Sequence, residues 1–164
     1  MSQRLQAIFF FLSALLFALL FFMPLVEFDA EQIDLFFYVF GMESKTPDGV
    51  IPFSKMFSIP VLVLAITVIL LAGYLAMSLF RAVKLSQFVK LHKIARISVI
   101  VAVVWIALVF AFYIPMTEKA LVGVNAVFYK PGVFLPVIAL VLLIAATLGL
   151  RKDIKKVRST DRIR

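Results

Sequence analysis

The strongest constraint on this chain is the spacing of its charged residues. None of them falls inside four long apolar blocks, at residues 5–26, 56–80, 97–115 and 133–150. Each block has about 18 residues or more, the length at which a helix crosses a hydrocarbon layer about 30 Å thick. A charged side chain at the centre of a span costs about 2.5–3.5 kcal/mol, and no block carries this penalty. The pattern predicts an all-α membrane protein with four transmembrane helices.

The composition agrees with a chain that faces lipid. Hydrophobic residues make up 64% of the sequence and charged residues 16%, whereas a water-soluble domain is nearer half apolar and a quarter charged. A soluble helical bundle would need a polar stripe on each helix, which these blocks lack. The first block is too long for the apolar region of a signal peptide, and no pair of small residues follows it at cleavage spacing. We therefore expect an uncleaved first helix.

Lys and Arg residues fall on alternate gaps between the blocks. The N-terminal lead, the connection 81–96 and the tail 151–164 hold thirteen of them, and the loops 27–55 and 116–132 hold four. The positive-inside rule then predicts that both termini and the 81–96 connection are cytoplasmic and that the two loops are outside. Seven of the nine acidic residues lie in these outer loops. We expect one integral membrane domain with this orientation.

The outer loops contain segments that favour β-structure. Ile33–Met42 is rich in aromatic and β-branched residues, Thr46–Gly49 has turn chemistry, and Val50–Phe53 and Leu121–Tyr129 are further candidate strands. We expect a small β-element that rests on the helix ends. Its aromatic side chains would serve as interfacial packing or, alternatively, as a ligand surface. These residues are Phe36, Phe37, Tyr38, Phe40, Phe53, Phe128 and Tyr129.

Two features inside the apolar blocks indicate how the helices pack. Trp105 lies near the middle of its block, so we expect a packed core side chain whose indole N–H needs a hydroxyl or water as acceptor, with a cavity-lining role as the alternative. Small residues recur four apart, which favours close helix packing within one bundle or against a partner helix. These pairs are Ala14 and Ala18, Ala72 and Ala76, Ser98 and Ala102, Ala107 and Ala111, and Ala145 and Gly149.

The residue types needed for most membrane chemistry are missing from the blocks. They contain no ionisable acid, base or histidine, which ion-coupled transport and intramembrane proteolysis generally require. The single histidine, His92, lies in the 81–96 connection, cysteine is absent, and there is no Gly-rich phosphate loop. We therefore predict a chain that is not an enzyme and has no catalytic residue, cofactor or metal site. The net charge of +8 is juxtamembrane, so it indicates anionic lipid headgroups rather than nucleic acid.

The two ends of the chain carry distinctive motifs. The opening Gln3-Arg4-Leu5-Gln6 precedes a Leu/Phe-rich span, and the tail contains Leu150-Arg151-Lys152-Asp153 and closes with Val157 to Arg164. Together with four spans, these motifs resemble an uncharacterised Bacteroidota family of four-helix membrane proteins (domain of unknown function 4293), over essentially the whole chain. The resemblance implies a location in the bacterial inner membrane and supplies no activity, substrate or catalytic residue. Ile154 and Val157, one turn apart, predict that the last helix continues into the tail with both residues facing the bilayer.

Both terminal motifs fall on the predicted cytoplasmic side, which suggests a shared site. We hypothesise a docking cluster formed by Arg4, Arg158, Asp161 and Arg162. The function we expect is that of a non-catalytic accessory or scaffold subunit, which binds another membrane protein or a second copy of itself. An oligomeric channel or transporter for a small solute is the alternative, although no polar stripe runs down any block. A membrane enzyme acting on lipid would need catalytic groups at one interface, and the acids of 27–34 have no suitable partner there.

Overall fold

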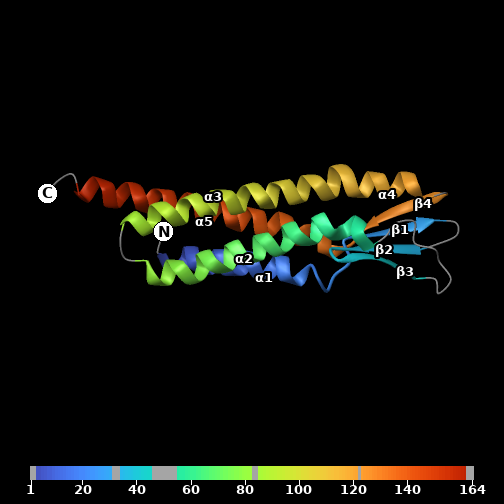
Figure 1. Cartoon of the computed structure of the whole chain (residues 1–164), viewed down its shortest axis with the longest axis horizontal. Helices are drawn as coiled ribbons and strands as arrows, with labels where there is room; N and C mark the ends of the chain where they lie inside the picture. Colours follow the sequence, from blue (N-terminus) through green and yellow to red (C-terminus); the bar gives the residue numbers. More distant parts are fainter. Residues whose placement is uncertain (1–2, 31–33, 46–54, 83–84, 122, 162–164) are drawn as a thin grey trace.

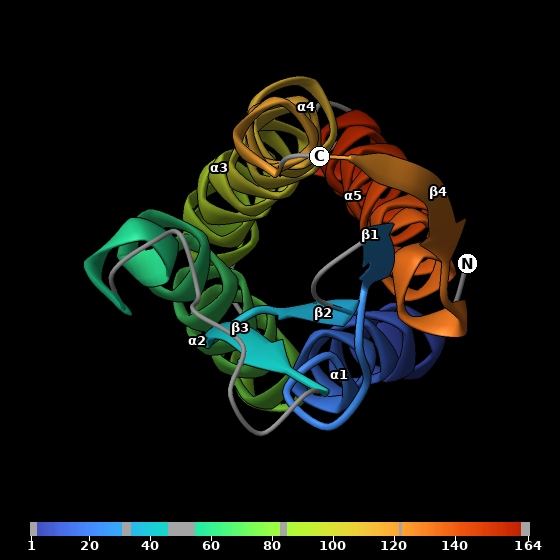
Figure 2. The same cartoon turned by 90° about the vertical axis from the view of Figure 1, so that its right-hand side faces the viewer.

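The computed structural model describes residues 3–30, 34–45, 55–82, 85–121 and 123–161. The fold is mostly helical, with four helical rods side by side and a small sheet at one end. The helices are α1 (Gln3–Leu19), α2 (Ile59–Arg81), α3 (Leu85–Leu108), α4 (Ile114–Ala120) and α5 (Phe134–Asp161). Helix α1 packs on α2 and α5, and α3 packs on the same two helices, so the bundle is a closed ring (Figure 2). In the end-on view each rod has two neighbours.

Three helices of the described chain are long and apolar enough to cross a membrane. They are Ile59–Arg81, Ser86–Ala120 and Pro131–Val157. Helix α1 is also apolar but has 17 residues, which corresponds to about 26 Å at about 1.5 Å per residue. The four predicted helices are therefore present as four rods, with α3 and α4 in the third, and the first rod is the shortest.

Helix α1 ends earlier than the first apolar block. After Leu19 the chain forms a tighter turn. The N–H of Phe21 bonds to the carbonyl of Ala18 (3.2 Å), and the N–H of Phe22 bonds to the carbonyl of Leu19 (3.0 Å). Such bonds to the third residue back close the last turn of a helix. The chain then enters strand β1 at Val26. The predicted block 5–26 thus contains a helix, a turn and the first residue of a strand.

The third rod runs past Pro115, where the sequence predicted that it would stop. A proline inside a helix lacks an N–H and its ring clashes with the carbonyl four residues back. Here residues Val109–Tyr113 form a π-helical turn, in which the N–H of Ile114 bonds to the carbonyl of Val109. The wider turn changes the hydrogen-bond pattern just before Pro115. Helices α3 and α4 are therefore one continuous rod (Figure 1).

The predicted outer loops supply the expected β-element, which is a four-stranded antiparallel sheet in the order β3-β2-β1-β4. Strand β1 is Val26–Ala30, β2 is Asp34–Tyr38, β3 is Gly41–Ser44 and β4 is Val124–Tyr129. The expected strand in Leu121–Tyr129 is confirmed as β4. The expected strand Ile33–Met42 is instead a hairpin, in which Tyr38 pairs with Gly41. The Thr46–Gly49 turn and the Val50–Phe53 strand lie outside the described residues.

One face of the sheet belongs to the core. Phe28, Leu35 and Phe37 are buried on it, and the Phe37 ring stacks on that of Tyr113 with centroids 6.0 Å apart. The predicted aromatic belt is therefore divided, because Phe37 is buried while Phe40, Phe128 and Tyr129 are exposed. Phe53 lies outside the described residues. On the other face, Glu27 forms ion pairs with Lys130 and Lys45.

The middle of the bundle is filled by Phe10, Phe17 and Trp105, all fully buried. The rings of Phe17 and Trp105 meet edge to face at 5.6 Å. The Trp105 indole donates to the carbonyl oxygen of Val61 on α2, at 2.9 Å. Trp105 is thus a packed core residue, as predicted, and its acceptor is a backbone carbonyl.

The small-residue pairs are divided between the interior and the surface. Ala72, Ala76 and Ala102 are buried hydrophobic residues and Ser98 is buried as well, which agrees with packing inside one bundle. The pair Ala107 and Ala111, on the third rod, is exposed on the outside of the ring.

Candidate functional site

Both termini lie at the end of the bundle that is opposite the sheet (Figure 1). This basic end comprises the start of α1, the end of α2, the start of α3 and the end of α5. It is the region in which the sequence placed its docking cluster. Three side chains, Gln3 and Gln6 of α1 and Asp153 of α5, make hydrogen bonds between helices at the basic end.

Gln3 joins the start of α1 to the end of α2. Its side-chain amide Nε2 donates to the carbonyl oxygens of Leu79 and of Ala82, the second at 3.0 Å. The last carbonyls of a helix have no donor within that helix. Gln3 supplies one from a residue 76 positions away in the chain.

Gln6 joins α1 to α5 one turn further along. It is fully buried, and its Nε2 donates to the carboxylate Oδ2 of Asp153 at 2.5 Å. The two terminal motifs therefore do meet, through Gln6 of the first and Asp153 of the second. The Oε1 atom of Gln6 is buried and has no hydrogen-bond partner among the described residues.

His92 lies in the first part of α3, before the predicted third span begins at residue 97. Its Nδ1 atom is buried without a hydrogen-bond partner among the described residues. Burial lowers the pKa of His92 below its usual value of 6.5, and the positive charges of Arg96 and Arg151 lower it further. At a given pH, His92 is therefore less often protonated than a histidine in water.

The predicted docking residues lie around and beyond the Gln6–Asp153 junction. Arg4 is exposed on the first turn of α1, the backbone of Arg158 and Asp161 lies in the last two turns of α5, and Arg162 is outside the described residues. With about 1.5 Å per residue, Arg4 is about 3 Å beyond the level of Gln6, while Arg158 and Asp161 are about 7.5 and 12 Å beyond that of Asp153. Arg158 thus lies about 4–5 Å further along the bundle axis than Arg4, and Asp161 about 9 Å further.

Helix α5 continues into the tail, as predicted, and its last turns extend past the other helices (Figure 1). Ile154 is buried against the bundle, which corrects the prediction that it faces the bilayer. It can reach the core because α5 stays packed on α1 as far as the Gln6–Asp153 contact. Beyond the Gln6–Asp153 contact, the exposed side chains of α5 include Lys155, Lys156, Val157 and Ser159. We refer to residues 155–161 as the α5 tip.

In the opening motif, the sequence suggested Arg4 as the docking residue. In the structure, Gln3 and Gln6 of this motif make hydrogen bonds to other helices. A signal for Gln6 was present, because Gln6, Phe10 and Phe17 recur at helical spacing on one face of α1 and are all buried. A glutamine on that face must find a partner inside the bundle. No group of three or more metal-ligating residues occurs in the part of the chain that the structure describes.

Replacing Asp153 by Ala is expected to destabilise the bundle by about 1–3 kcal/mol, because the buried Gln6 amide then loses its acceptor. Adding Gln6→Leu should recover part of this loss, since the second change removes the unpaired amide. Detergent unfolding of the four proteins of this double-mutant cycle, followed by circular dichroism, measures the coupling. Additive effects of the two substitutions would contradict a direct contact.

A family model matches residues 2–163 of the chain. Comparison with curated proteins and with solved structures gives no significant match. The matched family is described as Domain of unknown function (DUF4293), and it is the family that the terminal motifs and the four apolar blocks resembled. Because the match covers almost the entire sequence, the chain belongs to this family of unknown function.

Proposed function

We propose that the protein is an inner-membrane subunit that spans the bilayer four times, with both termini in the cytoplasm. The lengths and apolar character of α2, α5 and the α3–α4 rod support this proposal. The outer surface of the bundle supports it as well, because Leu70, Ile100 and Val141 are each at least 60% exposed. Such a belt of exposed apolar side chains is stable in lipid and costly in water. The basic end then faces the cytoplasm and the sheet faces outward.

The orientation is testable in a chain that has no cysteine. Single cysteines at Asp48 and Ser159 should differ in their reaction with an impermeant maleimide. In cells whose inner membrane is intact and accessible to the reagent, Asp48→Cys should be labelled and Ser159→Cys should not. After permeabilisation both should react. Labelling of Ser159→Cys alone in intact cells would reverse the orientation.

Within the membrane the protein acts as a non-catalytic scaffold that binds another membrane protein through the α5 tip. The observation that carries this proposal is the projection of the tip, whose side chains Lys155, Lys156, Val157 and Ser159 are exposed. The tip also contains Arg158 and Asp161, so it combines both charge signs with an apolar residue. Such a mixture is suited to a protein surface that offers complementary charges.

A channel is the alternative function, and the packing inside the bundle limits where its pore could lie. Phe10, Phe17 and Trp105 fill the middle of the ring and are fully buried. A conducting path would therefore have to run between several copies of the chain rather than through one. Purification as a homo-oligomer with no other protein would favour this function.

The scaffold proposal is tested by recovering the tagged full-length protein from native membranes in mild detergent. We expect one partner at constant stoichiometry, and a decrease of at least about tenfold in its recovery for the pair Asp161→Ala and Arg162→Ala. The matched control is Glu118→Ala with Lys119→Ala, which removes one acid and one base, both exposed, at the opposite end. Equal partner recovery for the two variants, at equal membrane levels, would refute docking at the tip.

A further inference from the structure

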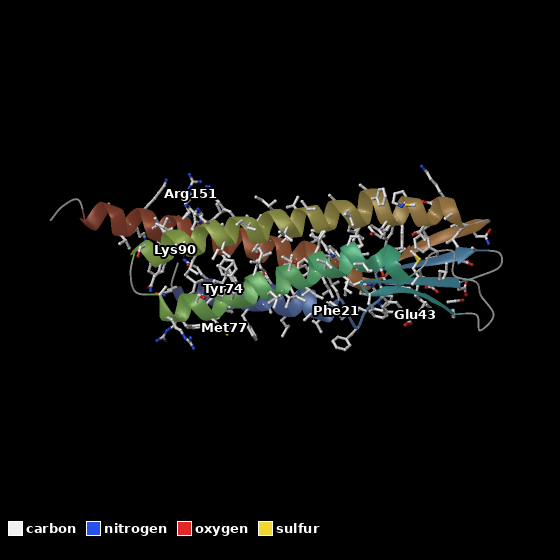
Figure 3. The ribbon with its side chains drawn as sticks, viewed as in Figure 1. Phe21, Glu43, Tyr74, Met77, Lys90 and Arg151 are labelled. Carbon is white, nitrogen blue, oxygen red and sulfur yellow. The ribbon has the colours of Figure 1, made fainter. Side chains whose placement is uncertain are left out.

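A cleft separates α2 and α3 at the basic end of the bundle. Its volume is about 300 Å³. The lining side chains include Tyr74, Ser78 and Arg81 from α2 and Gln87, Lys90 and Ile94 from α3. Figure 3 shows Tyr74 and Lys90 near each other where the two helices face, while Met77 points away from the bundle.

The cleft changes from polar to apolar along its length. The lining residues nearest to the basic end of the bundle are Arg81, Ala82, Gln87 and Lys90, and those nearest to its middle are Tyr74 and Ile94. Tyr74 is seven residues before Arg81, which places it about 10 Å deeper along the helix. In a membrane this is the step from the headgroup layer to the acyl chains. The cleft therefore has the polarity profile of a phospholipid.

The cationic end of the cleft has no acidic neighbour on its own helices. Neither α2 nor α3 contains an Asp or Glu residue. At the sheet end, by contrast, Lys45 and Lys130 are paired with Glu27. Among the described residues, Arg81 and Lys90 make no ion pair. Two cations that make no ion pair with the described residues, together with the Ser78 hydroxyl group between Arg81 and Tyr74 on α2, form a site for an anion with hydrogen-bond acceptors.

We propose that this cleft binds the headgroup of one anionic phospholipid from the cytoplasmic leaflet. The lipid phosphate lies between Arg81 and Lys90, and the Ser78 hydroxyl is available to the ester region. The first part of an acyl chain lies along Ile94 and the Tyr74 ring. The inference rests on the membrane insertion proposed above, and it goes beyond a general attraction of basic residues to the membrane by assigning one site.

The site is tested with the full-length protein in nanodiscs that contain phosphatidylglycerol or phosphatidylcholine with identical acyl chains. Native mass spectrometry after release from the nanodisc counts the phospholipids retained by each protein. We expect one retained phosphatidylglycerol and little retained phosphatidylcholine. Because a hydrogen bond from a cationic side chain to a phosphate contributes about 1.5 kcal/mol or more, the pair Arg81→Gln and Lys90→Gln should weaken retention by about 100-fold or more.

Two variants separate the cleft from diffuse electrostatic attraction. Lys93→Gln with Lys152→Gln removes the same charge from exposed residues outside the cleft lining, and retention should remain as in the parent protein. Ser78→Leu keeps every charge but fills the cleft, and it should abolish retention. Loss in the control pair, or full retention in Ser78→Leu, would overturn the site. Displacement of the lipid by millimolar glycerol phosphate would also overturn it, because a soluble phosphate would then be the ligand.

Membrane insertion has its own readout, so the two proposals can fail separately. Resistance of the protein to alkaline extraction from membranes reports insertion and does not depend on the cleft. An inserted protein that retains both lipids equally would refute the lipid site alone.

Discussion

Replacing Trp105 by Ala is expected to lower the free energy of unfolding by about 3 kcal/mol, which is the lower end of the range for removal of a buried tryptophan. The side chain is fully buried at the centre of the ring. It contacts the Phe17 ring edge to face at 5.6 Å and donates to the Val61 carbonyl at 2.9 Å. The lower end applies because lipid is as apolar as the bundle interior, so the loss consists of packing contacts and one hydrogen bond.

A graded series separates these two contributions. Trp105→Phe keeps an aromatic ring in the core but has no N–H, so we expect a smaller loss of about 0.5–1.5 kcal/mol from the hydrogen bond, together with the loss in ring size. The control is Phe80→Ala, which removes an aromatic ring that is 64% exposed and should leave stability nearly unchanged. The measurement is the midpoint of denaturing-detergent unfolding, followed by circular dichroism in a mild-detergent background. If Phe80→Ala destabilised the protein as much as Trp105→Ala, the Trp105 ring would not be packed in the core as described.

Replacing Gly132 by Ala should have the second large effect, a destabilisation of about 1–3 kcal/mol or more. A Cβ atom at Gly132 would lie 2.5 Å from the carbonyl oxygen of Pro24. The obstacle is backbone, so no side-chain rotation can relieve it. Next to this contact, the N–H of Lys130 bonds to the carbonyl of Leu25 at 3.0 Å. Moving the two main chains apart would therefore also weaken the pairing of β4 with β1.

Gly73 offers a matched control, because a Cβ added there meets no atom within 4 Å. Gly73→Ala lies within α2 and should be neutral or stabilise the protein by up to about 1 kcal/mol, through helix propensity. Both variants are compared by their yield of monodisperse protein in mild detergent and by their unfolding midpoints. If Gly132→Ala were as stable as Gly73→Ala, the close approach of Pro24 to Gly132 would be refuted.

The sequence predicted the helices well where hydropathy alone decides, and less well where backbone hydrogen bonding decides. The apolar run through Val26 conceals the end of α1, because hydropathy does not distinguish a helix from the turn and strand that follow Leu19. The alternation in Val26–Ala30, with Val26, Phe28 and Ala30 buried and Glu27 and Asp29 turned outward, was a readable strand signal. The continuation of the third rod past Pro115 could not be predicted, because it depends on a π turn that has no composition signature.

At the basic end too, some contacts could be predicted from the sequence and others could not. The terminal motifs were recognised as a pair, and the structure does bring Gln6 and Asp153 into contact. The cleft between α2 and α3 was not foreseen, since it depends on which faces of two helices meet. Tyr74 and Ser78 are isolated polar residues within the second apolar block, and their spacing alone does not indicate a site. They line one cleft with Arg81 and Lys90 only because α2 and α3 pack against each other.

The continuous third rod gives the molecule a mechanical property. The segment Ser86–Ala120 has 35 residues, which is about 52 Å of helix at about 1.5 Å per residue. One end stacks on the sheet through Tyr113 and Phe37, and the other end forms a wall of the cleft through Lys90 and Ile94. Such a rod works as a lever, since a tilt of about 5° displaces one end relative to the other by roughly 4–5 Å. A displacement of the sheet would therefore change the width of the cleft at the opposite end of the bundle.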